Sequence, residues 1–506
     1  MCGILFISNN DFSQEICNNA LNLMSHRGPD NSSFKIIKDN FLGHVRLSII
    51  DLNERSNQPF EFNNKTIVFN GEIYNYKDLI KEHNLVVNTN SDTEVLIRMY
   101  DKYGAKCLKF LNGMFSFVIY DKLKNSFFVA RDRLGIKPLY YRKINNSYIF
   151  SSEISPILYL KGDDFDEFGI RQYRKLRMTI KNDTLYQNIK MFPPGTYFDG
   201  NYFNKYWELE IFDKAPPDDV ELEFLIRDSI RLRKISDVPL GSYLSGGLDS
   251  TVLSILLSPE HTWTVGFENL NEFNWANIAN SKLQSKHHQI LINKEEFLDF
   301  AEMMIKKRKE PLSVPNEVLI YKMTKRVKKF NTVVISGEGA DELFWGYDRI
   351  FKYVKTLNNK ISIENFDKYY CYGSNKDDEV IDYALEGINY KNPIDHIAYY
   401  FQIIHLQGLL RRLDNSTMLC SVEARVPFVD HRLVELLAGS PFEWRMGDSF
   451  KEPLKRIFNK ITPDEIINRK KIGFPVPLKD IFPKYDHINT PMDNWLNFNL
   501  NKLLNE

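Results

Sequence analysis

The pattern of predicted strands changes once along this chain, and that change limits its possible folds more than any other feature. Residues 114–132 predict two strands joined by the polar turn Asp121–Asn125, and residues 140–153 repeat this hairpin pattern around Asn145 and Asn146. From residue 237 onward, short strands alternate with helices and each strand ends in glycine. The first pattern predicts a strand-rich half, and the second predicts a parallel α/β sheet with ligand loops at the carboxyl ends of its strands.

A polar segment separates the two patterns. Residues 212–223, FDKAPPDDVELE, combine a proline pair with an acidic cluster, and apolar residues then recur at helical spacing from Leu222 to Ile230. At 506 residues the chain is also too long for one core. We therefore expect a first domain, a linker, and a second domain that becomes mainly helical toward its C-terminal end, over residues 2–205, 206–218 and 219–506.

Charge and cysteine usage exclude several classes of protein. Lys+Arg and Asp+Glu both number 66, so the formal net charge is zero, which argues against nucleic acid or an anionic membrane as a partner. The five cysteines are scattered and form no C-x-x-C pair, so neither a disulfide framework nor a zinc site is indicated. No apolar run approaches the roughly 18 residues of a membrane span. We expect a cytoplasmic protein.

The chain begins MCGILFI, and Cys2 is the first candidate for chemistry. If the initiator methionine is removed, this residue carries a thiol and a free α-amine on one carbon. An α-amine has a pKa near 8, well below the ~10.4 of a lysine, so much of it is neutral and can serve as a base. Cys2 is therefore predicted to be a complete nucleophile–base unit.

The segment SGGLDS (245–250) lies at a predicted strand–helix junction. Gly246 and Gly247 let backbone amides approach an anion closely, Ser245 and Ser250 can donate hydroxyl groups, and the following helix adds the positive end of its dipole. Asp249 among phosphate donors is electrostatically unfavourable unless a cation is present, which indicates Mg²⁺.

A second glycine-rich segment, SGEGADELFWGY (336–347), follows another predicted buried strand. Glu338, Asp341 and Glu342 would place three carboxylates at the carboxyl end of that strand. Such a cluster is costly unless a metal ion or basic groups compensate it. For Glu342 we expect the role of a cap at a helix N-terminus.

These two segments, together with SVEARVPFVD (421–430), FKEPLKR (450–456) and RKKIGFPVP (469–477), resemble the N-type ATP pyrophosphatases and, within them, the asparagine synthetases. The resemblance implies that ATP is split between its α- and β-phosphates, that Glu338 and Lys451 are catalytic, and that Asp249 and Asp341 hold Mg²⁺. The positions that match ATP contacts of the family are Leu244, Ser245, Gly246, Gly247, Asp249, Ser250, Val265, Ser336 and Gly337.

The first half resembles the class II glutamine amidotransferases, whose fold is a four-layer αββα sandwich of the N-terminal-nucleophile type. The matching segments are CGI (2–4), HRGPD (26–30), GHVRLSIID (43–51), NGEIYNY (70–76), SDTE (91–94) and RDRLGIKPLYY (131–141). The resemblance makes Cys2 the nucleophile. His26 lies in HRGPD, where Gly and Pro signal a turn, so we expect it to order this loop and not to act as a base. The Asn70 side chain and the Gly71 amide would hold the oxyanion, although Asn-Gly alone signals a turn within the strand-like run 66–76. The implied glutamine-binding residues are Arg46 for the carboxylate, Asp92 and Glu72 for the ammonium group, and Leu47, Ser48, Ile49, Ile50, Asn70 and Gly71.

Taken together, the two resemblances imply glutamine-dependent synthesis of asparagine from aspartate and ATP. Ammonia would pass internally from Cys2 to an adenylated aspartate, with release of AMP and pyrophosphate, and a homodimer is expected by analogy. Two alternatives remain open: an amidotransferase of this architecture acting on another carboxylic acid, and a non-catalytic regulatory homologue. Two residues depart from the family pattern and could alter acceptor recognition. They are Trp345, where glycine is usual, and Lys309, where an acidic residue is common.

Overall fold

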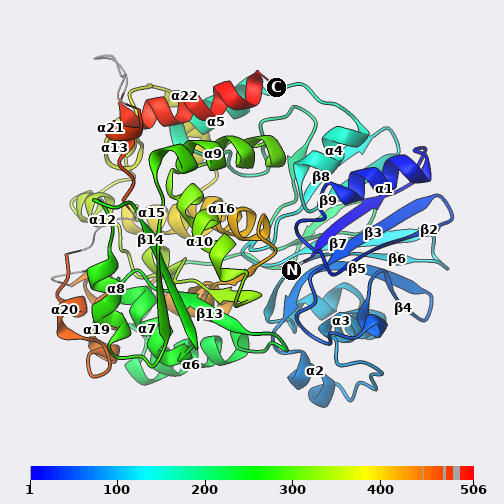
Figure 1. The fold of residues 1–506 in the computed structure, drawn as a ribbon, viewed down its shortest axis with the longest axis horizontal. Helices are drawn as coiled ribbons and strands as arrows, with labels where there is room; N and C mark the ends of the chain where they lie inside the picture. Colours follow the sequence, from blue (N-terminus) through cyan, green and yellow to red (C-terminus); the bar gives the residue numbers. More distant parts are fainter. Residues whose placement is uncertain (1, 448–449, 471–474, 483–489, 506) are drawn as a thin grey trace.

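The computed structural model describes residues 2–447, 450–470, 475–482 and 490–505, and everything below refers to these ranges. The chain forms two halves that lie against each other, with the N-terminus at their junction (Figure 1). The first half contains two six-stranded sheets, and the second contains a five-stranded sheet among many helices.

The two sheets of the first half are built from antiparallel neighbours. In the first sheet the order is β10 (Lys190–Met191), β8 (Tyr140–Ile144), β9 (Ser147–Ser151), β1 (Gly3–Ile7), β3 (Asn40–Arg46) and β2 (Asn31–Ile37). In the second sheet the order is β12 (Phe203–Lys205), β11 (Thr196–Phe198), β7 (Ser126–Arg131), β6 (Gly113–Asp121), β5 (Lys65–Ile73) and β4 (Phe60–Phe62).

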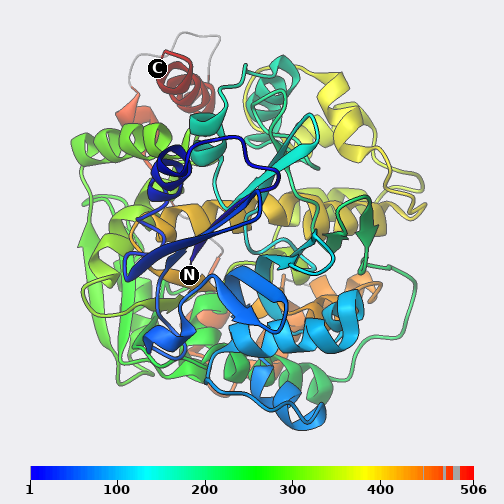
Figure 2. The same ribbon diagram turned by 90° about the vertical axis from the view of Figure 1, so that its right-hand side faces the viewer.

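Apolar side chains that alternate along these strands form a core between the two sheets, including Phe6 of β1, Val118 of β6 and Phe150 of β9. On the other face of the first sheet lie α1 (Gln14–Asn22) and α4 (Ile154–Leu160), which contact β3 and β9, whereas α3 (Asp92–Tyr103) contacts β5 of the second sheet and α2 (Tyr76–Glu82) packs on α3. Figure 2 shows the molecule with this first half facing the viewer. These four layers confirm the predicted αββα fold.

The two predicted hairpins are present. β6 pairs with β7 across residues 121–126, and β8 pairs with β9 across residues 144–147. The predicted turn at Asn70–Gly71 is wrong, because β5 runs through both residues and pairs with β6 at each of them. A Cβ atom on Gly71 would lie 2.2 Å from the Met114 carbonyl oxygen. The glycine is thus required by a close strand–strand approach and not by a turn.

The second half begins with α6 (Asp219–Arg233), which Asp218 caps by accepting a hydrogen bond from the Val220 amide. Its buried positions include Leu222, Ile226 and Ile230, as the helical spacing predicts. Strands of the second half then form one parallel sheet in the order β15 (Lys286–Leu291), β14 (His261–Gly266), β13 (Leu240–Tyr243), β16 (Val333–Ile335) and β17 (Glu423–Arg425).

Helices make up most of the remaining second half, as predicted. Around the sheet lie α7 (Leu248–Leu257), α8 (Phe273–Asn280), α9 (Lys294–Arg308), α10 (Asn316–Val327) and α16 (Leu406–Met418). The shorter helices are α11 (Ala340–Leu343), α12 (Asp348–Val354), α13 (Ile363–Tyr370), α14 (Asp378–Leu385), α15 (Pro393–Tyr399), α17 (His431–Leu437), α18 (Phe442–Met446), α19 (Glu452–Phe458), α20 (Asp464–Ile467) and α21 (Leu478–Ile481), and the described chain closes with α22 (Pro491–Leu504).

The order of the parallel strands determines where a ligand can bind. From β13 the chain passes to β14 on one side, and it returns later to β16 on the other side. This reversal makes the crevice beyond the carboxyl ends of β13 and β16 a topological switch point, the usual ligand position in an open α/β sheet. The segments 245–250 and 336–342 follow these two strands directly.

Buried polar contacts join the two halves. Arg27 and Lys137 of the first half both reach the Asp414 carboxylate of α16, at 2.8 and 3.0 Å. Tyr173 of α5 (Glu167–Leu176) donates to the Leu312 carbonyl at 2.7 Å. Because buried charges are costly unless paired, these contacts fix the relative position of the halves closely.

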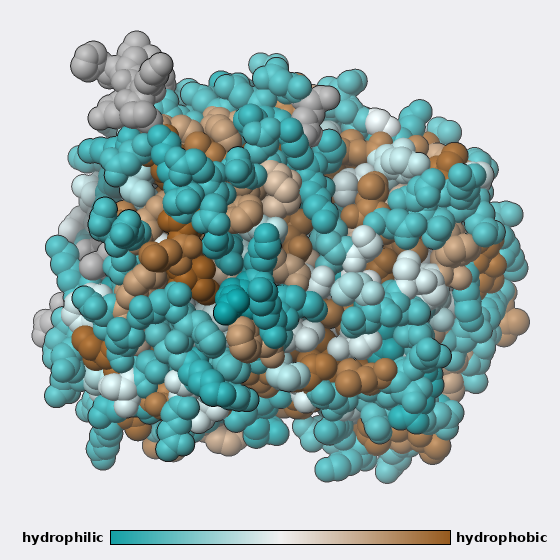
Figure 3. All heavy atoms as spheres, viewed as in Figure 1, coloured by the Kyte–Doolittle hydropathy of each residue, from teal (hydrophilic) through white to brown (hydrophobic). Residues whose placement is uncertain are grey.

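Hydrophilic residues cover most of the face shown in Figure 3, and the hydrophobic ones occur in small groups between them. Within the described ranges, none of the helices combines the length and apolar character needed to cross a bilayer.

Candidate functional site

Cys2 lies directly before β1, a strand near the middle of the first sheet. Its backbone nitrogen donates to Oδ1 of Asn70 at 3.2 Å, and its carbonyl oxygen accepts from Nε of Arg27 at 3.1 Å. The residue is 8% exposed. Burial raises the pKa of the Cys2 thiol, although a hydrogen bond from the Leu47 backbone and the charge of Arg46 act in the opposite direction. A base is therefore needed to generate the thiolate.

The side chain of Asn70 faces Cys2 across the space between the two sheets. Asn70 is fully buried in β5, and besides accepting from Cys2 it donates from Nδ2 to the Ser152 hydroxyl at 3.4 Å. Gly71 follows it in the same strand. The structure thus brings the predicted nucleophile and the predicted oxyanion residues together, an arrangement that suits stabilisation of charge developing beside Cys2.

Arg46 ends β3 and holds the loop that follows it. Its Nη1 and Nη2 atoms donate to four acceptors in that loop, at distances from 2.5 to 3.3 Å: the carbonyl oxygens of Ile50, Asp51 and Asn53 and the Asn57 side chain. Both Nη atoms of Arg46, which was predicted to bind the glutamine carboxylate, are therefore already used within the loop, and Nε is the donor for which these four bonds do not account. The loop contains the other predicted residues Leu47, Ser48, Ile49 and Ile50.

A cavity of about 450 Å³ opens beside Arg46. Leu47 and Ser48 line it from the first half, and Val238, Lys328 and Thr332 line it from the second. The Arg46 end of the candidate glutamine site therefore borders the second half, whereas Cys2, Asn70, Gly71, Glu72 and Asp92 are not among the residues that line this cavity.

Glu72 and Asp92 form an acidic pair near this boundary, and both are 5% exposed. Oδ2 of Asp92 accepts from the Ile73 amide at 2.9 Å, whereas Oε2 of Glu72 has no hydrogen-bond partner among the described residues. Burial raises the pKa of Asp92 to about 7, and burial together with the charges of Glu423 and Asp92 raises that of Glu72 well above its usual value. A cationic ligand group would favour the ionised forms of both.

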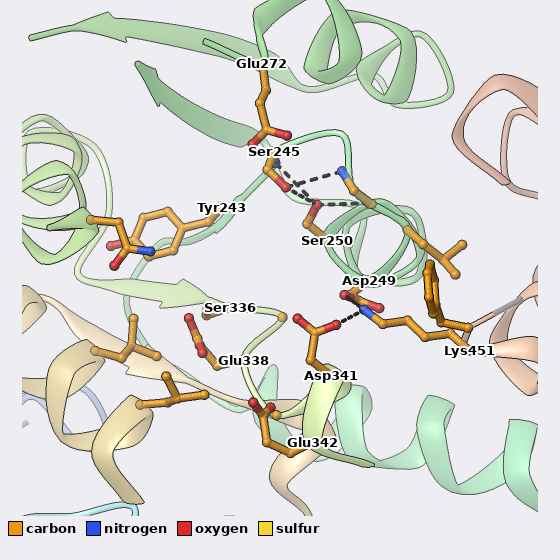
Figure 4. A pocket seen from close by; sticks show the side chains of 18 of the residues that line it. Tyr243, Ser245, Asp249, Ser250, Glu272, Ser336, Glu338, Asp341, Glu342 and Lys451 are labelled. Atoms are coloured by element: carbon orange, nitrogen blue, oxygen red, sulfur yellow. Dashed lines mark hydrogen bonds and ion pairs between the residues drawn. The ribbon is translucent and has the colours of Figure 1, made fainter. Parts of the chain in front are cut away.

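A second cavity, of about 410 Å³, lies at the switch point of the parallel sheet (Figure 4). The predicted residues that line it come from three segments far apart in the sequence: Ser245, Gly247, Asp249, Ser250, Ser336, Gly337, Glu338, Asp341 and Lys451. The other predicted ATP residues, Leu244, Gly246 and Val265, are not among its lining residues.

The loop 245–250 has the geometry of an anion-binding turn. The Ser245 hydroxyl lies 3.1 Å from that of Ser250 and accepts from the Gly247 amide at 3.3 Å. Gly246 has φ +72°, and a Cβ atom there would lie 2.3 Å from the Trp275 backbone, so only glycine fits this position. Helix α7 then begins at Leu248 with its N-terminus beside the cavity, where an anion is stabilised.

Lys451 lies between the two carboxylates predicted to bind metal (Figure 4). Its Nζ atom pairs with Oδ2 of Asp249 and lies 2.5 Å from Oδ1 of Asp341. Burial alone would lower the pKa of Lys451, but the charges of Asp249 and Asp341 outweigh burial and raise it. The two carboxylates therefore converge on one cation-sized point.

The two carboxylates also suit Mg²⁺, which proteins usually hold through one or two carboxylates together with the phosphates of a substrate. For the metal to bind between them, Nζ of Lys451 would have to leave the point that it occupies here. Among the described residues no group of three or more His, Cys, Asp or Glu side chains could hold a metal ion by itself. A metal here would thus depend on the nucleotide for its remaining ligands.

Glu342 does not cap a helix as expected. Gly339 occupies the position before α11, without a side-chain capping bond, and Glu342 is buried with its carboxylate accepting from the Tyr347 hydroxyl at 2.5 Å. Burial and the neighbouring Asp341 charge raise the pKa of Glu342 to about 8. Glu342 also lines the cavity, which motif matching alone does not reveal.

The two departures from the family pattern lie away from the cavity lining. Trp345 has φ +53° and is 1% exposed, with its ring stacked on Phe351 at 5.0 Å and Arg445 above it at 4.6 Å. The indole therefore fills the core behind the loop, and the left-handed backbone explains why glycine suits this position. Lys309 ends α9 in a left-handed conformation, and its carbonyl oxygen accepts from Tyr186 at 2.7 Å.

Sequence reasoning missed several charged residues of the cavity. Arg412 of α16 donates to Glu338 at 2.5 Å and to Asn316 at 3.3 Å. Arg469 pairs with Glu272 and donates to the Gly246 carbonyl at 2.8 Å. Arg469 opens the motif 469–477 and could have been found there, whereas Arg412 and Glu272 carried no recognised signal. Lys471 of the same motif lies outside the described residues.

Comparisons with known proteins agree with this two-part geometry. Residues 1–207 match the family described as glutamine amidotransferase domain, and residues 221–497 match the family described as asparagine synthase. A Bacillus subtilis protein named asparagine synthetase [glutamine-hydrolyzing] 1 is 30% identical over 95% of this chain and 87% of its own length. A putative asparagine synthetase [glutamine-hydrolyzing] 2 of Methanocaldococcus jannaschii is 35% identical over 69% of this chain and 76% of its own.

Fold and site together define a protein with an N-terminal-nucleophile amidotransferase half joined to a parallel-sheet synthase half. The chain belongs to the family of glutamine-hydrolysing asparagine synthetases, which are carbon–nitrogen ligases.

Proposed function

We propose that this protein hydrolyses glutamine at Cys2 and uses the ammonia to convert aspartate into asparagine. ATP would activate aspartate as β-aspartyl-AMP, with release of pyrophosphate, and ammonia would then displace AMP. The observation that carries the proposal is the convergence of Lys451, Asp249 and Asp341 in the cavity of a chain that also places Cys2 against Asn70. Family membership supports both half-reactions.

At the first site, the proposed steps follow from the positions of Cys2 and Asn70. Removal of Met1 would convert the Cys2 backbone nitrogen into an α-amine that takes the thiol proton. The Sγ atom then attacks the glutamine side-chain amide, and the Asn70 amide and the Gly71 N–H stabilise the resulting oxyanion. When the oxyanion collapses, the C–N bond breaks and the α-amine returns its proton to the leaving ammonia, and water then hydrolyses the thioester to glutamate and the free thiol. Glu72 and Asp92 would bind the glutamine ammonium group, and Nε of Arg46 would reach its carboxylate.

At the second site, Lys451 has the position and charge to stabilise the transition state of adenylation. Negative charge accumulates on the α-phosphate as aspartate attacks, and a fixed, buried cation lowers the energy of that state. Glu338, held by Arg412 at 2.5 Å, would act in the adenylation and amination steps. Asp249 and Asp341 would hold Mg²⁺, which neutralises pyrophosphate oxygens when bound.

The experiment that tests the proposal compares acid acceptors. The purified protein is incubated with Mg-ATP, glutamine and one acid at a time: aspartate, glutamate, succinate or β-alanine. Pyrophosphate and the amidated product are then quantified. We expect asparagine and pyrophosphate in equal amounts with aspartate, and neither above background with the other acids.

Omission controls separate the two half-reactions. Without aspartate, glutamine hydrolysis can persist while pyrophosphate stays at background. If pyrophosphate is released with another acid and without aspartate, that acid is the acceptor of this chain. A protein with neither activity would be a non-catalytic homologue. The cytoplasmic location and the homodimer stay predictions.

A further inference from the structure

We propose that the synthase half completes the glutamine site, with Arg425 and Asp237 as positioning residues for glutamine binding. Neither residue would touch the reacting atoms. The inference rests on the proposed function, because glutamine hydrolysis at Cys2 is its readout. Two residues of the synthase half would thus determine part of the affinity for glutamine.

Arg425 is the last residue of β17 and is fully buried. Its Nε atom donates to Glu423 at 2.5 Å, and Nη1 donates to the carbonyl oxygens of Arg233 and Ile235 at 2.8 and 2.6 Å. These bonds aim Nη2 across the boundary, where it lies 3.7 Å from Oε1 of Glu72. The guanidinium is thus held rigidly by its own half and directed at a carboxylate of the other.

The charge balance around Glu72 depends on this arginine. Glu72, Asp92 and Glu423 are three buried carboxyl groups that repel one another electrostatically. The Arg425 charge lowers the pKa of Glu72 and Asp92 against the larger effect of burial. Without it, both groups would more readily hold a proton, and a protonated carboxyl binds an ammonium group poorly.

Asp237 contacts the loop that follows Arg46, on another side of the glutamine site. Its backbone amide donates to the Ile49 carbonyl at 2.9 Å, and its Oδ2 atom accepts from the Asp51 amide at 2.8 Å. This reciprocal pair ties the loop that follows Arg46 to the segment leading into β13. Asp237 is exposed, so its side chain can be changed without opening a core.

Arg425 also borders the nucleotide site through its backbone. The Arg425 carbonyl oxygen accepts from the Ser336 amide at 2.9 Å, and Ser336 lines the second cavity. Because this bond is made by the backbone, a change of the Arg425 side chain leaves it in place. Side-chain variants therefore separate an effect on glutamine from an effect on ATP.

The test measures hydrolysis of glutamine to glutamate by the full-length chain and compares Arg425→Met with Arg425→Lys. We expect Arg425→Met to raise KM for glutamine about tenfold while kcat stays within about twofold, the change expected when a charge-assisted contact is lost from the bound state. Arg425→Lys should recover most of this loss, because it restores the charge. Ammonia-dependent pyrophosphate release should stay within about twofold of wild type in both.

Matched control variants distinguish a specific effect on KM for glutamine from a general loss of stability. Arg233→Met removes another buried arginine, which pairs with Asp430 at 3.0 Å and also lies over the Tyr74 ring. In the part of the chain that the structure describes, Arg233 forms neither a hydrogen bond nor an ion pair with Glu72. Arg233→Met should lower the melting temperature and leave KM for glutamine unchanged. Asp237→Ala should raise KM several-fold, whereas Asp218→Ala, an exposed cap of α6, should not.

The outcomes separate the two proposals. If wild type hydrolyses glutamine and KM stays unchanged in Arg425→Met and in Asp237→Ala, this inference is wrong and the proposed function stands. Equal losses of glutamine-dependent and ammonia-dependent activity would likewise overturn it in favour of a structural role. Should Arg425→Met not fold, Asp237→Ala decides alone. A wild type without any glutamine hydrolysis would overturn both proposals.

Discussion

The Nζ atom of Lys451 lies 2.5 Å from Oδ1 of Asp341, and the same ammonium group also pairs with Asp249. The three residues come from the start of α19, from α11 and from α7. The buried ammonium group of Lys451 therefore connects three segments that are distant in the sequence, beyond the carboxyl ends of the parallel strands.

Lys451→Met should lower ammonia-dependent pyrophosphate release by about two to three orders of magnitude. The reason is the loss of a preorganised cation that stabilises charge in the transition state. The measurement is the initial rate with Mg-ATP, aspartate and ammonium chloride, and Lys460→Met on the exposed surface is the control. A rate within threefold of wild type would remove Lys451 from the catalytic machinery.

Gly346→Ala should also impair this half-reaction. An added Cβ atom would lie 1.9 Å from Oδ1 of Asp341 and 2.9 Å from Cε of Lys451, so the carboxylate has to move. We expect at least a tenfold lower rate, because a misplacement of about 1 Å can cost up to two orders of magnitude. In Gly162→Ala the new atom meets nothing within 4 Å, and that variant should behave as wild type. Equal rates for the two variants would contradict the packing argument.

Cys2→Ala should abolish glutamine-dependent asparagine synthesis and leave ammonia-dependent synthesis within about twofold of wild type. The substitution removes the nucleophile and keeps both the first sheet and the second cavity. Product formation is measured with each nitrogen donor in turn. Loss of both activities would show that the two sites do not work separately.

Asp92→Asn should change how stability depends on pH. Asp92 has a folded-state pKa of about 7, raised chiefly by burial from 3.8, so the folded state binds its proton more tightly than the unfolded state does. Its contribution to the free energy of unfolding is full below about pH 4 and is lost as pH rises toward 7. Wild type should therefore lose stability relative to the variant across this window.

Urea unfolding midpoints of wild type and Asp92→Asn at pH 4.5, 6 and 7.5 provide the measurement. The difference should shift steadily in favour of the variant. A difference that stays constant across these three pH values would show that Asp92 is already ionised in the folded protein at pH 4.5.

Local patterns predicted much of the fold. The hairpin of β6 and β7 follows from a polar turn between two apolar runs, and α6 follows from its cap and apolar spacing. The pattern failed at Asn70–Gly71, where a close approach of Met114 from the neighbouring strand overrides the turn preference. It also missed β17, because a three-residue strand with the sequence EAR has no apolar alternation.

The candidate sites were predictable where a motif marks them and not where they depend on distant contacts. Asp249 and Asp341 belong to glycine-rich segments with evident chemistry, whereas Arg412 lies within a helix and reaches Glu338 only through the folded arrangement. The contact of Arg425 with Glu72 joins the two halves of the chain, and no local pattern encodes such a pair. Trp345 shows the opposite case, in which an unusual residue at a motif position packs into the core.

The central claim is that both sites act in one reaction, and transfer of labelled nitrogen tests it most directly. The protein is given glutamine labelled with ¹⁵N at its side-chain amide, together with aspartate, Mg-ATP and an excess of unlabelled ammonium. Mass spectrometry then measures ¹⁵N in the asparagine formed. We predict that most of the product carries ¹⁵N and that Cys2→Ala yields only unlabelled asparagine. Product without label from the wild-type protein, or no asparagine at all, would contradict the account.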